Sequence, residues 1–267
     1  MSDLQQRAEQ LLGARVRASR RVAGGDLSAV SLIELDDGRQ AIAKRGPGAP
    51  IEADMLRAIA ATGAPAPHVL AVEDELLLLE RLEANGGPSG AWESLAGALA
   101  LLHAGRSERY GWDFDYHFGR VPIPNARNAD WAAFWADNRL RCHLPHVDPA
   151  LARRLGALAD RCGTMLPRDP PASLLHGDLW GGNILVANGR VTGLIDPACY
   201  YGDREVDAAM LTLFDHLPAH FVERLALLPG WQRRQPLYRL WPLLVHLRLF
   251  GGVYRTQIEA ELSLLGF

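Results

Sequence analysis

The arrangement of apolar residues changes near residue 85, and this change limits the folds that the chain can adopt. Ahead of it, short apolar runs are separated by turn residues, which is typical of strands. The strands expected there cover residues 15–22, 30–35, 40–45 and one run on each side of the acidic turn 73–75, with helices over 3–12 and 51–61. Beyond it, apolar residues recur at helical spacing. The helices expected there cover residues 91–104, 129–142, 148–163, 203–216, 218–228 and 236–250.

The segment at residues 85–90, Asn-Gly-Gly-Pro-Ser-Gly, has the composition of a linker and lies where the pattern changes. We therefore expect an α+β chain with two lobes. A small, β-rich N-terminal lobe would cover residues 1–84, and a larger, mainly helical C-terminal lobe would cover residues 85–267.

Composition excludes several classes of protein. The chain is 48% hydrophobic and 22% charged, which is typical of a globular protein and excludes disorder for most of its length. A net charge of −3 gives no electrostatic reason to bind nucleic acid or an anionic membrane, and the longest aliphatic run, Leu76–Leu79, is too short to span a bilayer. Three widely spaced cysteines favour a reducing, cytoplasmic location. We expect no nucleic acid or membrane partner, and we favour a monomer.

Lysine is almost absent from the chain. Of the 28 basic residues, 27 are arginine and only Lys44 is lysine. Arginine presents a broad planar fork, whereas lysine presents a compact charge on a thin stem. The retained lysine therefore marks a position where a compact ammonium is needed, although chance survival at a solvated position would leave the same count.

A β-like insertion at residues 174–195 interrupts the helical pattern and carries polar residues in short turns. Asp178, Asn183 and Asp196 offer carboxylate and amide oxygens, which are the ligands that magnesium prefers beside water and phosphate. The Asn188-Gly189 turn should form a hairpin that returns Asp196 close to Asn183. A base, two metal ligands, a distant lysine and a glycine turn are the parts that phosphoryl transfer requires.

These segments resemble the protein-kinase-like superfamily. Its catalytic loop has the form His-x-Asp with an Asn five residues after the Asp, which corresponds here to His176, Asp178 and Asn183. The eight residues His-Gly-Asp-Leu-Trp-Gly-Gly-Asn at 176–183 resemble the fructosamine kinase (ketosamine 3-kinase) family more closely still. So does Asp-Pro-Ala-Cys-Tyr-Tyr-Gly-Asp-Arg-Glu-Val-Asp at 196–207. The resemblance covers nearly the whole chain and implies a bilobal, protein-kinase-like fold.

The resemblance assigns residues of the first lobe to ATP. Lys44 would bind the α- and β-phosphates, and Glu52 would pair with it, although the helix macrodipole alone favours an acid at a helix start. Gly24 and Gly25 would let backbone amides approach the phosphates, with a simple hairpin turn as the alternative.

The resemblance also implies an adenine site and a magnesium site. Glu80 and Leu82 match the hinge whose backbone reads adenine, and a plain buried strand end is the alternative. Asn183 and Asp196 would hold Mg²⁺.

The acceptor residues lie in and after the loop. Asp178 is expected to be the base for the attacking hydroxyl. Trp180 is expected to stack on the C–H face of a sugar, with a role as a core anchor as the alternative. Asp203 or Glu205 would meet a substrate amine, and Asp207 would brace the loop. The implied reaction is ATP- and magnesium-dependent phosphorylation of a small-molecule or protein-bound ketosamine on the hydroxyl of the third sugar carbon. Such a reaction would serve protein deglycation.

Two other functions remain open. An aminoglycoside or choline kinase relative would also carry His-Gly-Asp with a later Asn and Asp, but Trp180 and the segment 196–205 argue against it. A nucleotide-binding regulator without transfer activity would lack at least one of four residues that are all present, namely Lys44, Asp178, Asn183 and Asp196.

Overall fold

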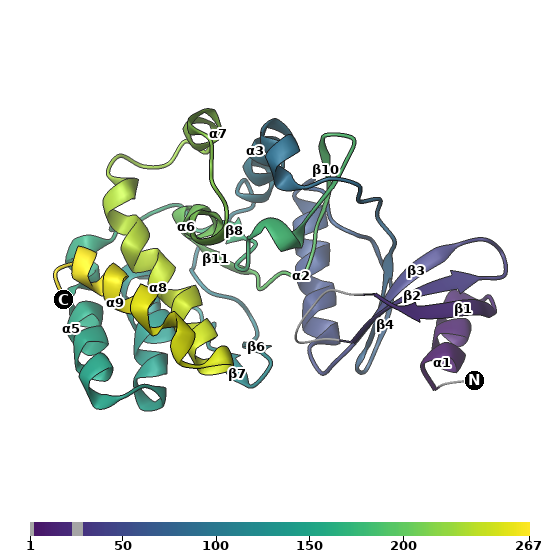
Figure 1. Cartoon of the computed structure of the whole chain (residues 1–267), viewed down its shortest axis with the longest axis horizontal. Coiled ribbons are helices and arrows are strands. Elements are labelled where there is room, and N and C mark those ends of the chain that lie inside the picture. Colours follow the sequence, from purple (N-terminus) through teal and green to yellow (C-terminus); the bar gives the residue numbers. More distant parts are fainter. Residues whose placement is uncertain (1–2, 23–28) are drawn as a thin grey trace. The chain divides into compact units, whose positions relative to one another are not determined.

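The computed structural model describes residues 3–22 and 29–267, which form two compact units (Figure 1). One unit comprises Met1–Leu95 and Asn183–Pro197, and the other comprises Ala96–Gly182 and Ala198–Phe267. Gly24 and Gly25, the predicted phosphate-binding glycines, lie outside the described residues.

The first unit is built on a five-stranded antiparallel sheet in the order β1-β2-β3-β5-β4. The strands are β1 (Val16–Arg21), β2 (Ala29–Leu35), β3 (Gln40–Arg45), β4 (Val69–Glu73) and β5 (Leu76–Glu80). Two helices, α1 (Asp3–Leu12) and α2 (Ala49–Ala61), belong to the same unit. These elements match the strands and helices expected for the first 84 residues.

Strand periodicity explains how the sheet is covered on both faces. Successive side chains of a strand point to opposite faces, and the four leucines Leu76–Leu79 of β5 are all buried. Leu76 and Leu78 pack in a cluster with Ala8 of α1, whereas Leu77 and Leu79 pack with α2. On β3, Ala43 belongs to the α1 cluster, so the next residue, Lys44, faces α2.

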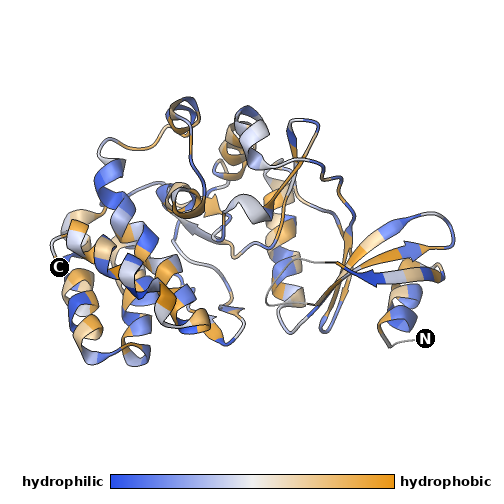
Figure 2. Ribbon diagram, in the orientation of Figure 1, coloured by the Kyte–Doolittle hydropathy of each residue, from blue (hydrophilic) through white to orange (hydrophobic). Residues whose placement is uncertain are grey.

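The outer strand β1 carries most of the arginines of the five-stranded sheet. All of its residues after Val16 are exposed, among them Arg17, Arg20 and Arg21, and Figure 2 shows much of this strand in the hydrophilic colour. Charge on an exposed edge strand opposes unwanted pairing with other chains.

The predicted hairpin consists of β9 (Ile184–Ala187) and β10 (Arg190–Leu194). Its turn residues, Asn188 and Gly189, have φ angles of 53° and 73°, as a tight turn of this kind requires. The hairpin groups with the β-rich unit, because the backbone N–H groups of Asn85 and Gly86 donate to the Val186 carbonyl. The contacts therefore divide the chain differently from a single boundary at residue 84, and lobes of 1–84 and 85–267 remain a prediction.

The second unit is mainly helical. Its helices are α4 (Trp131–Trp135), α5 (Pro149–Met165), α6 (Glu205–Phe214), α7 (Ala219–Arg224), α8 (Trp231–Phe250) and α9 (Arg255–Leu264), and α3 (Trp92–Leu102) joins it to the first unit. Its strands form two small pairs, β6 (Tyr116–Phe118) with β7 (Val121–Ile123), and β8 (Ser173–Leu175) with β11 (Tyr200–Gly202).

Several helices differ from their expected ranges. The helix expected over 129–142 is the short α4, followed by a π-helical turn over Ala136–Leu140 and a 3₁₀ segment that contains Pro145. Helix α8 begins before the expected residue 236 and continues through Pro236 and Pro242, both of which are buried. In the described part of the chain, no helix, α8 included, is both long and apolar enough to cross a membrane.

Candidate active site

The single lysine lies between two carboxylates within the first unit. Lys44 Nζ donates to Glu52 Oε1 of α2 at 2.5 Å and to Asp196 Oδ1 at 2.6 Å. Lys44 can reach α2 because it lies on the α2-facing side of β3, and only 7% of the residue is exposed. The predicted pairing of Lys44 with Glu52 is present, and Asp196 joins it after the β9–β10 hairpin.

The charges around Lys44 keep it protonated. Burial by itself would lower the pKa of Lys44, but the negative charges of Glu52 and Asp196 outweigh that effect and raise it. Burial raises the pKa of Glu52, and the ammonium of Lys44 opposes that shift. The Lys44 ammonium therefore provides a fixed positive charge beside the partly exposed carboxylate of Asp196.

Asp196 and Asn183 are linked through the backbone at the base of the hairpin. The Ile195 N–H donates to the Asn183 carbonyl at 3.0 Å, so the two residues flank one closed turn of chain. Asp196 has a φ of +55°, a conformation that few residues other than glycine adopt. Such strain is found where a side chain has to be aimed in one direction.

Asn183 and Asp196 fit a magnesium ion. One amide oxygen and one carboxylate are hard donors, and Mg²⁺ commonly takes one or two protein ligands and completes its shell with water and phosphate. Among the described residues, no three His, Cys, Asp or Glu side chains gather as a metal cluster. A site built on Asn183 and Asp196 would therefore be of this two-ligand kind.

The predicted hinge lies just after β5. Glu80 is tied to the preceding loop, because its N–H donates to the His68 carbonyl at 2.9 Å and its Oε2 accepts from the His68 N–H at 3.2 Å. The side chain of Leu82 lies against Gly193 of β10, where a Cβ would be 2.2 Å from Leu82 Cδ1. Among the described residues, the Leu82 N–H has no hydrogen-bond partner, and its contact with adenine remains a prediction.

Asp207 of the second unit holds the start of the loop at 176–183 through hydrogen bonds to its backbone. Its carboxylate accepts from the backbone N–H groups of His176 and Gly177, both at 3.0 Å, and from His103 Nε2 at 2.9 Å. Burial alone would raise the pKa of Asp207, but the hydrogen bond from His103 and the positive charge near it lower that pKa. The expectation that Asp207 braces the loop is confirmed; the part played by His103 was not expected, because its spacing in the sequence carries no signal.

Glycine is the only residue type that fits at position 177 of this loop. Gly177 has a φ of +79°, and a Cβ there would lie 2.1 Å from the carbonyl oxygen of Ala198. The Ala198 N–H in turn donates to the His176 carbonyl at 2.9 Å. The segment after Asp196 therefore packs directly against the backbone that precedes Asp178.

Trp180 lies at the surface of the second unit and is not a core anchor. It is 42% exposed, and its ring centroid is 6.2 Å from that of Phe214, which is 44% exposed. The indole ring folds over Gly182, where a Cβ would be 2.2 Å from Trp180 Cη2. Asp178, two residues earlier, is half-buried.

Asp203 and Glu205, one of which was predicted to meet a substrate amine, are instead paired with other residues of the protein. Arg234 of α8 binds both oxygens of Glu205, at 2.6 and 2.8 Å, and Tyr238 donates to Asp203 at 2.8 Å. Both carboxylates are buried, and burial together with the charge of Glu205 raises the pKa of Asp203 to about 6. Their partners lie within the protein, so we assign the two residues to the packing of α6 against α8.

One contact of the loop was not expected from the sequence. The Gly181 N–H donates to Asp215 Oδ2 at 3.0 Å, which places the carboxylate at the end of α6 directly against the loop. No pattern in the sequence links these two positions.

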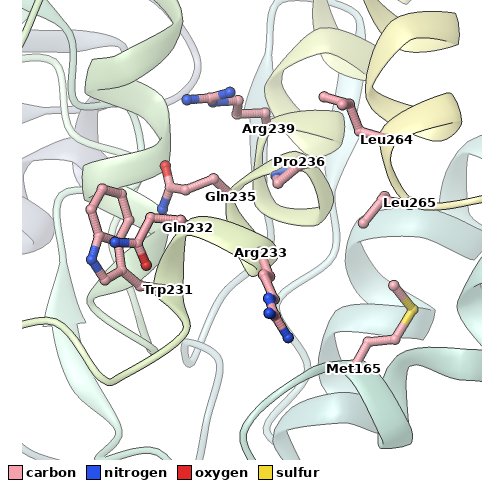
Figure 3. Close-up of a pocket in the computed structure, with 9 residues that line it drawn as sticks. All are labelled: Met165, Trp231, Gln232, Arg233, Gln235, Pro236, Arg239, Leu264 and Leu265. Carbon is pink, nitrogen blue, oxygen red and sulfur yellow. The ribbon is translucent and has the colours of Figure 1, made fainter.

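A pocket of about 560 Å³ lies in the second unit among the ends of α5, α8 and α9 (Figure 3). It is lined by Met165, Trp231, Gln232, Arg233, Gln235, Pro236, Arg239, Leu264 and Leu265. None of the predicted site residues lines this pocket, and we assign it no part in phosphoryl transfer.

The fold defines a structural class, that of the protein-kinase-like proteins. A crystal structure of an aminoglycoside phosphotransferase with AMP-PNP and hygromycin B superposes with a TM-score of 0.71 over 98% of this chain and 99% of that one, at 16% identity. A likeness at this identity concerns the fold alone, and it confirms the protein-kinase-like fold.

The family follows from closer relatives. The family model described as fructosamine kinase matches residues 3–265, and the chain belongs to that family. A protein of Synechocystis named as a probable ketoamine kinase is 37% identical, with 79% of this chain and 76% of the relative covered. A relative of the same name from Staphylococcus aureus is 31% identical, with 91% of each chain covered. A crystal structure assigned to a fructosamine-3-kinase of Thermobifida fusca has a TM-score of 0.89 at 29% identity and covers 98% of both chains. The protein is an ATP-dependent kinase.

Proposed function

We propose that this kinase phosphorylates ketosamines on the hydroxyl of the third sugar carbon, with ribulosamine and fructosamine adducts as substrates. The proposal depends mainly on the position of the only lysine, which lies between Glu52 and Asp196. A site for a nucleoside triphosphate requires this arrangement. Membership of the fructosamine kinase family supports a ketosamine as the acceptor. A cytoplasmic location, expected from the cysteines, is part of this proposal.

The first unit holds the nucleotide in this proposal. The ammonium of Lys44 binds the α- and β-phosphates, Glu52 fixes its direction, and the backbone at Glu80 and Leu82 reads the adenine. Asn183 and Asp196 hold Mg²⁺. When bound, that ion neutralises charge on the phosphates.

Asp178 acts on the acceptor. Its carboxylate takes the proton of the attacking hydroxyl, while that oxygen forms a bond to the γ-phosphorus and the bond to ADP breaks. Asp207 holds the loop backbone on which Asp178 is carried, through His176 and Gly177. Trp180 offers an exposed ring face to the C–H side of the sugar.

The position of the new phosphate explains the proposed biological role. In such a product, the keto group makes the protons of the first carbon acidic, so an enaminol forms between the first and second carbons. The electron pair of the enaminol expels inorganic phosphate from the third carbon, and water hydrolyses the imine that results, which releases the free amine and a dicarbonyl sugar. This sequence of events would reverse the glycation of a protein lysine.

A panel of acceptors tests the substrate class. We expect ADP release with ribulose-lysine, erythrulose-lysine or fructose-lysine, and little with kanamycin or choline at equal concentration. Phosphorus-coupled carbon NMR of the fresh product should place the phosphate on the third carbon. Faster turnover of kanamycin or choline than of every ketosamine would contradict the proposal and favour an antibiotic- or choline-directed kinase.

Two substitutions separate the predicted roles of the carboxylates. Asp196→Asn should weaken magnesium-dependent nucleotide binding, since it removes a charged metal ligand. Asp178→Asn should leave ATP affinity nearly unchanged while kcat falls at least about a hundredfold, because only the acceptor loses its base. Calorimetric titration with a non-hydrolysable ATP analogue measures both affinities. Equal loss of affinity in the two variants would show that the roles are misassigned.

A further inference from the structure

Asp215 is placed against the loop that carries Asp178, within the same unit. Its Oδ2 accepts the Gly181 N–H at 3.0 Å, and a Cβ at Gly181 would lie 2.8 Å from Asp215 Oδ1. The fit is therefore close enough that a side chain at position 181 would displace the carboxylate. Asp215 is half-buried, so one side of it faces solvent.

The charge of Asp215 is not explained by its own surroundings. It is the C-cap residue of α6, where the partial negative charge of the helix end disfavours a carboxylate. Within the part of the chain that the structure describes, no lysine, arginine or histidine forms an ion pair with it. An asparagine would accept the same hydrogen bond from Gly181 without a charge, so bracing of the loop does not require an acid here.

Two exposed aromatic rings belong to the residues that precede Asp215 and Gly181 in the chain. Phe214 precedes Asp215 in the chain and Trp180 precedes Gly181, and their ring centroids are 6.2 Å apart. Both side chains are more than 40% exposed. A carboxylate without an ion-pair partner can bind a cation, and exposed ring faces nearby can pack against the aliphatic carbons that carry it.

We propose that Asp215 determines acceptor specificity by binding the protonated amine of the ketosamine, an inference that rests on the proposed function. The ammonium donates to Asp215 Oδ1, and Trp180 and Phe214 flank the carbons on either side of it. Gly181 is three residues from Asp178, so their Cα atoms are at most about 11 Å apart. The amine and the third-carbon hydroxyl of a ketosamine are separated by only three carbons, so one small substrate can approach both carboxylates.

Asp215→Asn tests the charge separately from the brace, because the amide oxygen can still accept from Gly181. We expect kcat/KM for ribulose-lysine to fall at least about tenfold, while kcat/KM for free ribulose and KM for ATP stay within about twofold of the wild type. Asp215→Glu, which retains the charge, should recover part of the loss. Asp169→Asn removes a charge from an 81% exposed carboxylate of the same unit and serves as the matched control.

The outcomes distinguish this inference from the proposed function. If wild-type enzyme phosphorylates ribulose-lysine and Asp215→Asn keeps its preference over ribulose, Asp215 does not read the amine. Equal losses on both acceptors would mean that Asp215 only braces the loop, and they also overturn the inference. If the wild type phosphorylates no ketosamine, the proposed function fails first. Calorimetry with ribulose-lysine then shows whether Asp215→Asn weakens binding of the amine, and unchanged binding overturns the inference.

Discussion

Lys44 makes two short ion pairs from one ammonium, and its compact shape is what allows this. The Nζ atom donates to Glu52 and to Asp196 at 2.5 and 2.6 Å, in surroundings where the lysine is almost fully buried. A guanidinium is wider and directs its donors in a plane, so it would push one carboxylate away. The two contacts support the prediction that the one lysine among 28 basic residues is retained for its compact shape.

Replacing this lysine by arginine keeps the charge and changes its shape. We expect Lys44→Arg to reduce kcat/KM for ATP at least about tenfold, or about 1.4 kcal/mol of transition-state stabilisation. Arg17→Lys, the reverse exchange on the exposed strand β1, is the control and should have no effect. Initial rates over a range of ATP concentrations measure kcat/KM for both variants. Wild-type kinetics in Lys44→Arg would contradict the prediction that a compact ammonium is needed at this position.

Residues in short local motifs were predictable, whereas residues brought together by tertiary packing were not. The loop at 176–183 and Asp196 follow a fixed spacing, and Lys44 is identified by composition. Asp215 reaches Gly181 across 34 residues of chain, through the packing of α6, and no local pattern encodes that contact. For the same reason the sequence suggested Asp203 and Glu205, which are acidic and near the loop in sequence but are used for packing.

At the scale of elements, the loop tolerates no side chain at Gly177. Gly177→Ala places a Cβ 2.1 Å from the Ala198 carbonyl and imposes a positive φ on alanine. We expect a loss of stability of about 2 kcal/mol or more and a larger loss of kcat, because the backbone held by Asp207 has to move. Urea unfolding and steady-state rates measure the two effects.

A second glycine gives the control for that substitution. Gly163 lies in α5 with nothing within 4 Å of the position of a Cβ. Gly163→Ala should raise the free energy of unfolding by about 0.5–1 kcal/mol and leave kcat unchanged, since alanine favours helix. A Gly177→Ala variant that behaves like Gly163→Ala would contradict the close packing described here.

Strands were predicted more accurately than long helices, for physical reasons. Several strands of the first unit are bounded by turn residues, such as Asp37-Gly38 between β2 and β3, and these residues fix the strand ends. Helix α8 runs through two prolines that normally end a helix, because burial of its apolar residues outweighs the hydrogen bonds that proline cannot make. Tertiary packing, which local spacing does not report, determined those boundaries.

At the scale of the whole molecule, acid stability should depend on His143. The ring is fully buried, and burial, with the charges of Arg248 and Arg139 beside it, lowers its pKa to about 3. The unfolded chain takes up this proton below about pH 6.5, whereas the folded protein does not until about pH 3. Protons therefore favour the unfolded state, and stability should fall as the pH drops through that window.

His143→Gln cannot take up the proton, so the variant should lack this part of the pH dependence. Urea unfolding at pH 7.5, 5.5 and 4.5 should show the wild type losing roughly 2–4 kcal/mol relative to His143→Gln as the pH falls. Asp203, whose pKa is raised to about 6, gives the opposite slope, but both proteins share it and it cancels. His220→Gln on the exposed face of α7 is the control, and an identical slope in all three proteins would exclude His143 as the source.

Because the hairpin β9–β10 belongs to the first unit but follows the second unit's first segment in the sequence, the first unit is not synthesised as one piece. Most of the β-rich unit lies in Met1–Leu95, but its last strands arrive only with Asn183–Pro197, after 87 residues of the helical unit have been made. On a ribosome, the first five strands and α2 therefore emerge long before Asp196, so Lys44 is made together with Glu52 but without its second carboxylate partner. A continuous segment that carries the whole proposed nucleotide site therefore also has to include residues 96–182 of the helical unit.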